Sequence, residues 1–133
     1  MRKDKSELRG ARDLLVYRKA YALAMDIFHA SKSWPIEERY SLTDQARRAS
    51  RSVCSNLREA WAKRRYEAHF VSKITDADGE NGETDTWLDF ARDCGYLSES
   101  AHERLAKDSR EVGAMLGGVL ADPSPFLLRL PGA

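Results

Sequence analysis

The segment SLTDQARRASRSVCSNLREA, residues 41–60, decides the fold that this chain predicts. Small and apolar residues recur in it every three or four positions, the spacing of one face of an α-helix. The members of this face are Leu42, Ala46, Ala49, Val53, Asn56 and Ala60. We expect Ser41 to cap the helix, with Asp44 as its capping-box partner. The segment therefore predicts an amphipathic helix that buries one face.

Three further segments, 16–34, 70–91 and 101–119, show the same spacing, and none alternates with the period of a strand. Pro35 should end the first segment, because proline disfavours helical geometry in the residue before it. The connections are short, so successive helices should run antiparallel. The sequence predicts an all-α fold, an antiparallel up-and-down four-helix bundle.

The ends of the chain set the predicted domain boundaries. We expect an N-terminal extension over residues 1–12, the bundle over 13–121 and a C-terminal tail over 122–133. Ser98 should cap the fourth helix, and Gly95 should end the third in a left-handed conformation. Four tail residues are too apolar for a solvated segment and should dock on the bundle or on a neighbouring subunit: Phe126, Leu127, Leu128 and Leu130.

Composition narrows the class of protein. A chain of 133 residues has the length of one domain. No apolar run approaches the roughly 20 residues of a membrane helix, and the N-terminal stretch lacks the apolar core of a secretory signal. Cys54 and Cys94 have no metal-like spacing and should be reduced thiols. We expect a cytoplasmic protein without a membrane partner.

Charge is distributed unevenly along the chain. Residues 1–73 hold 17 Lys and Arg against 9 Asp and Glu, whereas residues 74–133 hold 5 against 12. A basic face attracts phosphate or an acidic partner. The alternative is that the two halves neutralise each other within one fold or between identical copies.

The second helical segment and the turn after it carry the candidate nucleic-acid-binding residues. They are Arg47, Arg48, Arg51, Arg58, Lys63, Arg64 and Arg65. Arg47, Arg51 and Arg58 are four and seven positions apart and share a helix face, which suits contacts to phosphates. Tyr66 and Trp61 lie nearby in sequence and can stack on bases. Alternatively, these arginines pair with the acidic third helix or with adjacent subunits.

A polar layer is expected inside the bundle. Its candidates are Gln45, Asn56, Asn81 and Thr84. Antiparallel pairing brings Asn81 near Gln45, and a buried amide needs hydrogen-bond partners. We therefore predict that Asn81 bonds to Gln45 or to a neighbour of it, which would fix the helix register.

No pattern predicts a catalytic residue, a cofactor or a metal site. The three histidines lie on different helices, and Glu99–His102 is an unaccompanied match to the paired Glu-x-x-His of di-iron bundles. The acidic run from Asp76 resembles a calcium loop but has Asn81 in the glycine position and Trp87 in the position of the bidentate glutamate. We expect a protein that is not an enzyme.

Four motifs together resemble a known family. They are LVYRKA (15–20), WPIEERYSLTDQARRAS (34–50), SVCSNLREA (52–60) and GYLS (95–98). In their order they are similar to the 23S rRNA-intervening-sequence proteins, also called S23-type proteins, over about residues 13–120. The third segment departs from the family pattern in being more polar.

The resemblance implies properties that the residues alone do not give. It implies a left-handed bundle that assembles into homo-oligomeric rings, typically pentamers. The related accessory variability proteins of diversity-generating retroelements are thought to bind nucleic acid and a reverse transcriptase through a basic surface. The function expected is non-enzymatic binding of RNA or a nucleoprotein partner through the basic face. The alternative is a protein-interaction scaffold that binds no nucleic acid.

Overall fold

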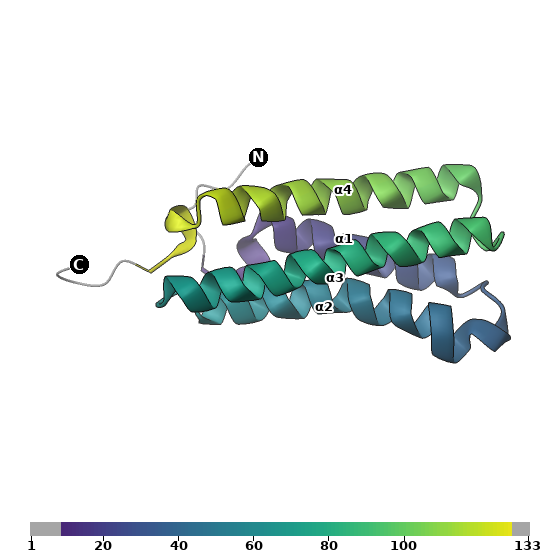
Figure 1. Cartoon of the computed structure of the whole chain (residues 1–133), viewed down its shortest axis with the longest axis horizontal. Coiled ribbons are helices and arrows are strands. Elements are labelled where there is room, and N and C mark those ends of the chain that lie inside the picture. The colour runs from purple at the N-terminus through teal and green to yellow at the C-terminus, as the bar shows by residue number, and fades with distance from the viewer. Residues whose placement is uncertain (1–8, 129–133) are drawn as a thin grey trace.

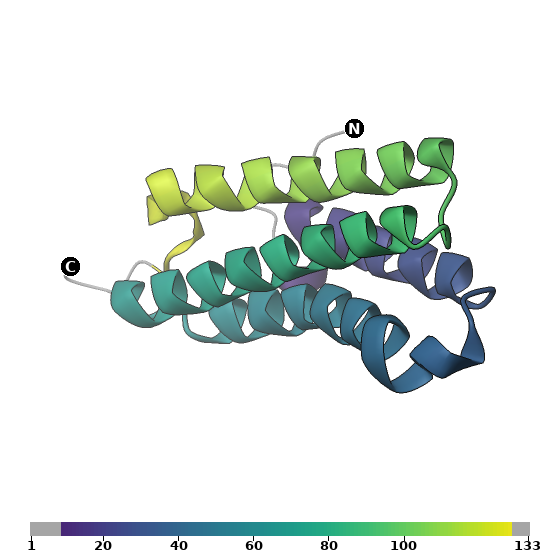
Figure 2. The same ribbon diagram turned by 45° about the vertical axis from the view of Figure 1, so that its right-hand side comes forward.

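Four long helices packed side by side make up the computed structural model, which describes residues 9–128 (Figure 1). Their bounds are Leu15–Ser31 for α1, Asp44–Ala62 for α2, Glu67–Asp93 for α3 and Glu99–Ala121 for α4. Each helix packs against the next, α4 packs back on α1, and neighbours run antiparallel (Figures 1 and 2). The described residues contain no strand. The predicted all-α, up-and-down architecture is confirmed.

The core is divided along the bundle axis. One apolar cluster includes Val53, Leu57 and Ile74 together with residues from the C-terminal half of α4. A second includes Leu23 and Leu88. The predicted buried face of α3 is fully observed, namely Phe70, Ile74, Ala77, Asn81, Thr84, Leu88 and Ala91. None of the described helices has the length and apolar character needed to cross a membrane.

Two of the predicted helix ends are confirmed. The backbone N–H of Ala101 donates to Ser98 Oγ at 3.1 Å, so Ser98 caps α4. Gly95 has φ of +81° just beyond the end of α3. The N–H of Gly95 reaches the Arg92 carbonyl and that of Tyr96 reaches the Ala91 carbonyl, the bonding of a Schellman motif. Both ends depend on residues within one turn, which is why sequence reveals them.

The connection between α1 and α2 differs from the prediction. Helix α1 ends at Ser31, before Trp34, and α2 begins at Asp44 after a π-helical turn over Arg39–Thr43. Ser41 does not cap α2, because its hydroxyl donates to Glu38 Oε1 at 2.6 Å inside that turn. The predicted capping box of Ser41 and Asp44 is therefore wrong.

Both ends of the described chain pack on the bundle. Ala11, assigned to the N-terminal extension, is buried in a 3-10 turn before α1. In the tail, the ring of Phe126 stacks on Phe70 at 6.3 Å between centroids, and the Leu128 N–H donates to the Arg64 carbonyl. The tail thus docks on its own bundle as far as Leu128; Leu130 lies outside the described residues.

Candidate nucleic-acid interface

An open groove of about 650 Å³ runs along the N-terminal half of α2 and the π turn before it. We call it the basic groove. Its lining consists of Arg39, Tyr40, Thr43, Asp44, Arg47, Arg48, Arg51, Ser52 and Ser55. Four of these residues are arginines and Asp44 alone is acidic. The groove therefore presents concentrated positive charge, which suits a polyanion.

A clasp between two loops holds the π turn that forms one end of this groove. The hydroxyl of Tyr96, just beyond α3, donates a hydrogen bond to Glu38 Oε2 at 2.9 Å. The other carboxylate oxygen, Glu38 Oε1, accepts a hydrogen bond from the Ser41 hydroxyl. The hydrogen bonds from Ser41 and Tyr96 lower the pKa of Glu38, and the bond to Glu38 raises the pKa of Tyr96 to about 12. The clasp is therefore intact at neutral pH and fixes where Arg39 and Tyr40 begin the groove.

Two arginines of the groove are oriented by α1. Arg47 Nε donates to Ser31 Oγ at 2.8 Å, and the Arg47 guanidinium lies 4.9 Å from the centroid of the Phe28 ring. Arg51 lies over the same ring at 5.8 Å. A guanidinium above an aromatic face keeps its charge and its outward donors. These contacts position the two side chains without neutralising them.

The guanidinium of Arg48 is turned toward α3. It lies 3.8 Å from Glu80 and 3.7 Å from Glu83 of α3, and it bonds to Gln45 in its own helix. This is the outcome that the alternative interpretation predicted, namely basic residues pairing with the acidic third helix. Arg48 therefore lines the groove with part of its charge already compensated.

A second groove, of about 390 Å³, adjoins the first between α1 and α2. We call it the tyrosine groove. It is lined by Tyr17, Tyr21, Ala24, Met25, Arg51, Cys54, Ser55 and Arg58. Burial raises the pKa of the Cys54 thiol to about 11, so this part of the floor is neutral. Arg51 and Ser55 line both grooves, so the two grooves adjoin at these residues.

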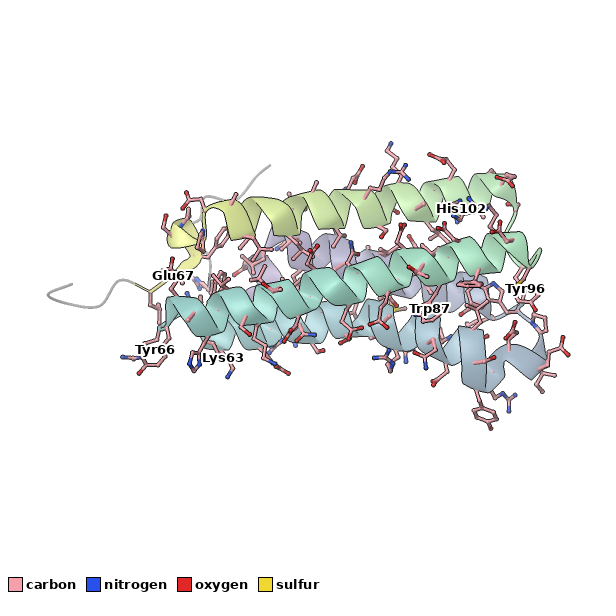
Figure 3. The ribbon with its side chains drawn as sticks, viewed as in Figure 1. Lys63, Tyr66, Glu67, Trp87, Tyr96 and His102 are labelled. Atoms are coloured by element: carbon pink, nitrogen blue, oxygen red, sulfur yellow. The ribbon has the colours of Figure 1, made fainter. Side chains whose placement is uncertain are left out.

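The basic residues of the α2–α3 turn lie apart from the basic groove. Figure 3 places Lys63 and Tyr66 at the end of the bundle opposite Tyr96. Arg64 folds back on Trp61, 3.6 Å from the ring centroid, and burial lowers the pKa of its guanidinium. Lys63 and Arg65 are exposed. The structure thus divides the seven candidate residues between two places.

Two residues of the basic groove were missed from sequence. Arg39 and Tyr40 precede the helical pattern, and the π turn carries both to the groove. Tyr40 is 85% exposed although it is a large aromatic residue. A basic and an aromatic residue side by side before Ser41 were visible in the sequence. Where their side chains lie depends on the π turn, which helical periodicity does not reveal.

A buried polar layer is present, and two of its four predicted members, Asn81 and Thr84, belong to it. It consists of Ser50, Asn81, Thr84 and Ser109, all buried and lying between the two apolar clusters. Asn81 Nδ2 donates to the Ser109 carbonyl of α4 at 2.9 Å, which corrects the predicted bond to Gln45. Gln45 and Asn56 are only half-buried and bond within their own helix.

Gly113 makes room for this layer. A Cβ at Gly113 would lie 3.3 Å from Asn81 Nδ2, a tight contact, so glycine at this position lets the amide lie close to α4 without a shift. The hydroxyls of Thr84 and Ser50 donate to carbonyls four residues earlier in their own helices. Such bonds satisfy a buried hydroxyl without a partner from another helix.

Potential metal ligands do not gather into a group of three or more within residues 9–128. His102, in α4, lies 2.8 Å from Asp89 of α3 and is buried (Figure 3). Two ion pairs also join neighbouring helices. Lys19 pairs with Glu111 between α1 and α4, and Lys73 pairs with Glu59 at 2.7 Å between α3 and α2. Of these contacts, Lys19–Glu111 joins the basic half of the sequence to the acidic half, as Arg48 does with Glu80 and Glu83.

Comparisons with known proteins give a family and a similar fold. The family model for 23S rRNA-intervening sequence protein matches residues 12–118. A crystal structure of a protein of unknown function from the S23 ribosomal protein family of Bacteroides thetaiotaomicron superposes with a TM-score of 0.73. It is 26% identical, and the match covers 80% of this chain and 96% of that one. No curated protein matches the chain.

Proposed function

Because the chain belongs to the 23S rRNA-intervening sequence protein family, and because its basic groove suits a polyanion, we propose that it binds RNA without catalysing a reaction. The binding surface is the basic groove with its continuation to Arg58. A nucleoprotein that presents RNA, such as a reverse transcriptase with its template, is the wider class of partner.

The observation that carries this proposal is that most arginines of the binding surface have no carboxylate partner within residues 9–128. Arg39, Arg51 and Arg58 are exposed, and none forms an ion pair with a carboxylate among the described residues. Arg47 and Arg51 are held in place by Phe28 while their charge stays uncompensated. Positively charged groups that are fixed but unpaired favour a phosphate backbone, because little ordering remains to be done on binding.

The test is RNA binding measured against salt concentration with a double charge reversal, Arg39→Glu with Arg51→Glu. Both side chains are exposed, so the folded bundle should survive the change. We expect the double variant to lose binding and the slope of log affinity against log salt to become shallower by about 1 to 2, as for two lost phosphate contacts. The fold is checked by circular dichroism.

The matched control is Arg104→Glu with Lys107→Glu on α4. Both residues are exposed and lie outside both grooves, and the change in net charge is the same. It should weaken RNA binding only slightly, through the overall field. Equal losses in the two double variants, or no binding by the unaltered protein even at low salt, would remove the proposal.

Self-assembly into a homo-oligomeric ring, with five copies as the expected number, is part of the same proposal. Exposed apolar side chains outside both grooves support it, because a neighbouring copy would cover them: Ile36 is 76% and Leu15 51% exposed. Light scattering coupled to size exclusion gives the mass in solution. A monomer at every concentration would contradict the ring.

A second function, a protein-interaction scaffold without RNA binding, is favoured by Arg48. That arginine already pairs with Glu80 and Glu83, and the other arginines would pair likewise with acidic residues of adjacent copies. The double reversal Arg39→Glu with Arg51→Glu separates the two functions. Loss of assembly supports the scaffold, whereas loss of RNA binding with the assembly intact supports the RNA-binding protein.

A further inference from the structure

We propose that the RNA bound by this protein is unpaired, and that its bases stack on tyrosines along the joined basic and tyrosine grooves. This inference rests on the proposed function and specifies its ligand. The grooves adjoin at Arg51 and Ser55, so one strand can follow α2 from Tyr40 past these two residues to Arg58.

Three of the five arginines that line this path form one row on α2, whereas Arg39 lies in the π turn before the helix and Arg48 is turned toward α3. Arg47, Arg51 and Arg58 lie within about 40° of one another around α2, and the row is about 16 Å long at the helical rise per residue. A single row matches one phosphate backbone. Double-stranded RNA is held by contacts that bridge its grooves and reach both strands, so it calls for cations in more than one row.

Aromatic rings lie beside the row on the side of α1. Tyr21 is 54% exposed and its ring centroid is 6.2 Å from that of Tyr17, and Tyr40 at the other end is 85% exposed. The neighbouring floor, Ala24, Met25 and Cys54, offers no charge. Exposed rings next to phosphate-binding groups suit bases that are free to splay out, because the faces of paired bases are covered within a duplex.

The probe is an RNA of about 15 nucleotides without self-complementarity, labelled with fluorescein and used alone or annealed to its complement. Fluorescence anisotropy gives both affinities. We expect the single strand to bind at least tenfold more tightly than the duplex. Tyr21→Ala should weaken single-strand binding by about 5- to 100-fold. It should leave duplex binding unchanged, and Tyr21→Phe should retain the affinity, since the ring is kept.

Phe90→Ala is the matched control, because Phe90 is also 54% exposed but lines neither groove. It should leave both affinities unchanged. Equal binding of the two RNA forms, or a Tyr21→Ala variant as active as the Phe90→Ala variant, would overturn the preference for unpaired RNA while the proposed function stands. Failure of both RNA forms to bind would overturn the proposed function itself.

Discussion

Asn81 places a primary amide inside the bundle and forms one side-chain hydrogen bond there. Its Nδ2 donates across to α4, whereas its Oδ1 is buried without a hydrogen-bond partner among the described residues. An unsatisfied buried acceptor costs free energy. A buried polar contact of this kind can fix the register of two helices at the expense of stability.

Asn81→Asp should therefore destabilise the protein in a pH-dependent way. A carboxylate facing the Ser109 carbonyl has no donor to offer, and we expect a loss of about 2–4 kcal/mol in the free energy of unfolding at pH 7. Burial raises the pKa of the new Asp in the folded state. Stability relative to the original chain is thus retained at pH values below the unfolded pKa and lost as pH rises through the folded pKa.

Urea unfolding at several pH values measures this effect. Asn56→Asp is the control, because Asn56 is half-buried and bonds only within α2. It should change the free energy of unfolding by less than about 1 kcal/mol. A loss for Asn81→Asp that does not shrink on acidification would show that the charge is not the cause.

Replacing Glu80 or Glu59 by glutamine should change the free energy of unfolding in opposite directions. Burial, with help from Glu83, raises the pKa of Glu80, whereas the bond from Lys73 lowers that of Glu59. Glu80→Gln should raise the free energy of unfolding at pH 7 by less than about 1 kcal/mol, and Glu59→Gln should lower it. The Glu80 difference should vanish below the ordinary pKa of 4.5, whereas the Glu59 difference should be lost only as pH falls below 4.5 through the lowered pKa of the folded state. Urea midpoints at pH 4 and 7 check both signs.

At the scale of the element, α3 shows a helix held by its neighbours against its composition. Gly79 and Gly82 lie within it and are exposed, and a Cβ at either position would meet nothing within 4 Å. Each glycine costs about 1 kcal/mol relative to alanine in a helix. The buried face of α3, packed between α2 and α4, offsets that cost.

Alanine substitutions at two glycines should therefore act in opposite directions. Gly82→Ala should stabilise by about 0.5–1 kcal/mol, because the backbone is helical and the space is open. Gly95→Ala should destabilise by about 1–2 kcal/mol, because φ of +81° is unfavourable for a residue with a Cβ even where space is open. Thermal denaturation gives both values, and a stabilising Gly95→Ala would contradict the assignment of the Schellman motif.

At the scale of the whole molecule, the C-terminal segment closes one end of the bundle. It leaves α4, stacks Phe126 on Phe70 at the start of α3 and bonds to Arg64 in the α2–α3 turn. Figure 1 shows it turning back across that end. The segment thereby covers core residues that would otherwise meet water.

Phe126→Ala should lower the free energy of unfolding by about 1–2 kcal/mol, through the lost aromatic pair and the lost burial. Leu128→Ala is the control, since Leu128 is 44% exposed and its hydrogen bond is made by the backbone. Its effect should stay within about 0.5 kcal/mol. Equal effects in urea unfolding would mean that the Phe126 ring contributes no specific packing.

Periodicity and caps determined most of the fold. The buried face of α3, the Ser98 cap and the Gly95 turn follow from residues within one or two turns of each other, so local physics was enough. The candidate site was predicted less completely. The face shared by Arg47, Arg51 and Arg58 follows from helical spacing, but the groove also needs Tyr40.

Only the tertiary structure decided which distant residues meet. It gave Asn81 a partner on α4 instead of Gln45, turned Arg48 toward α3, and placed Tyr21 of α1 beside the arginines of α2. The physical reason is that spacing fixes which side of a helix a residue occupies, whereas the rotation and register of packed helices depend on how all four faces fill the core together.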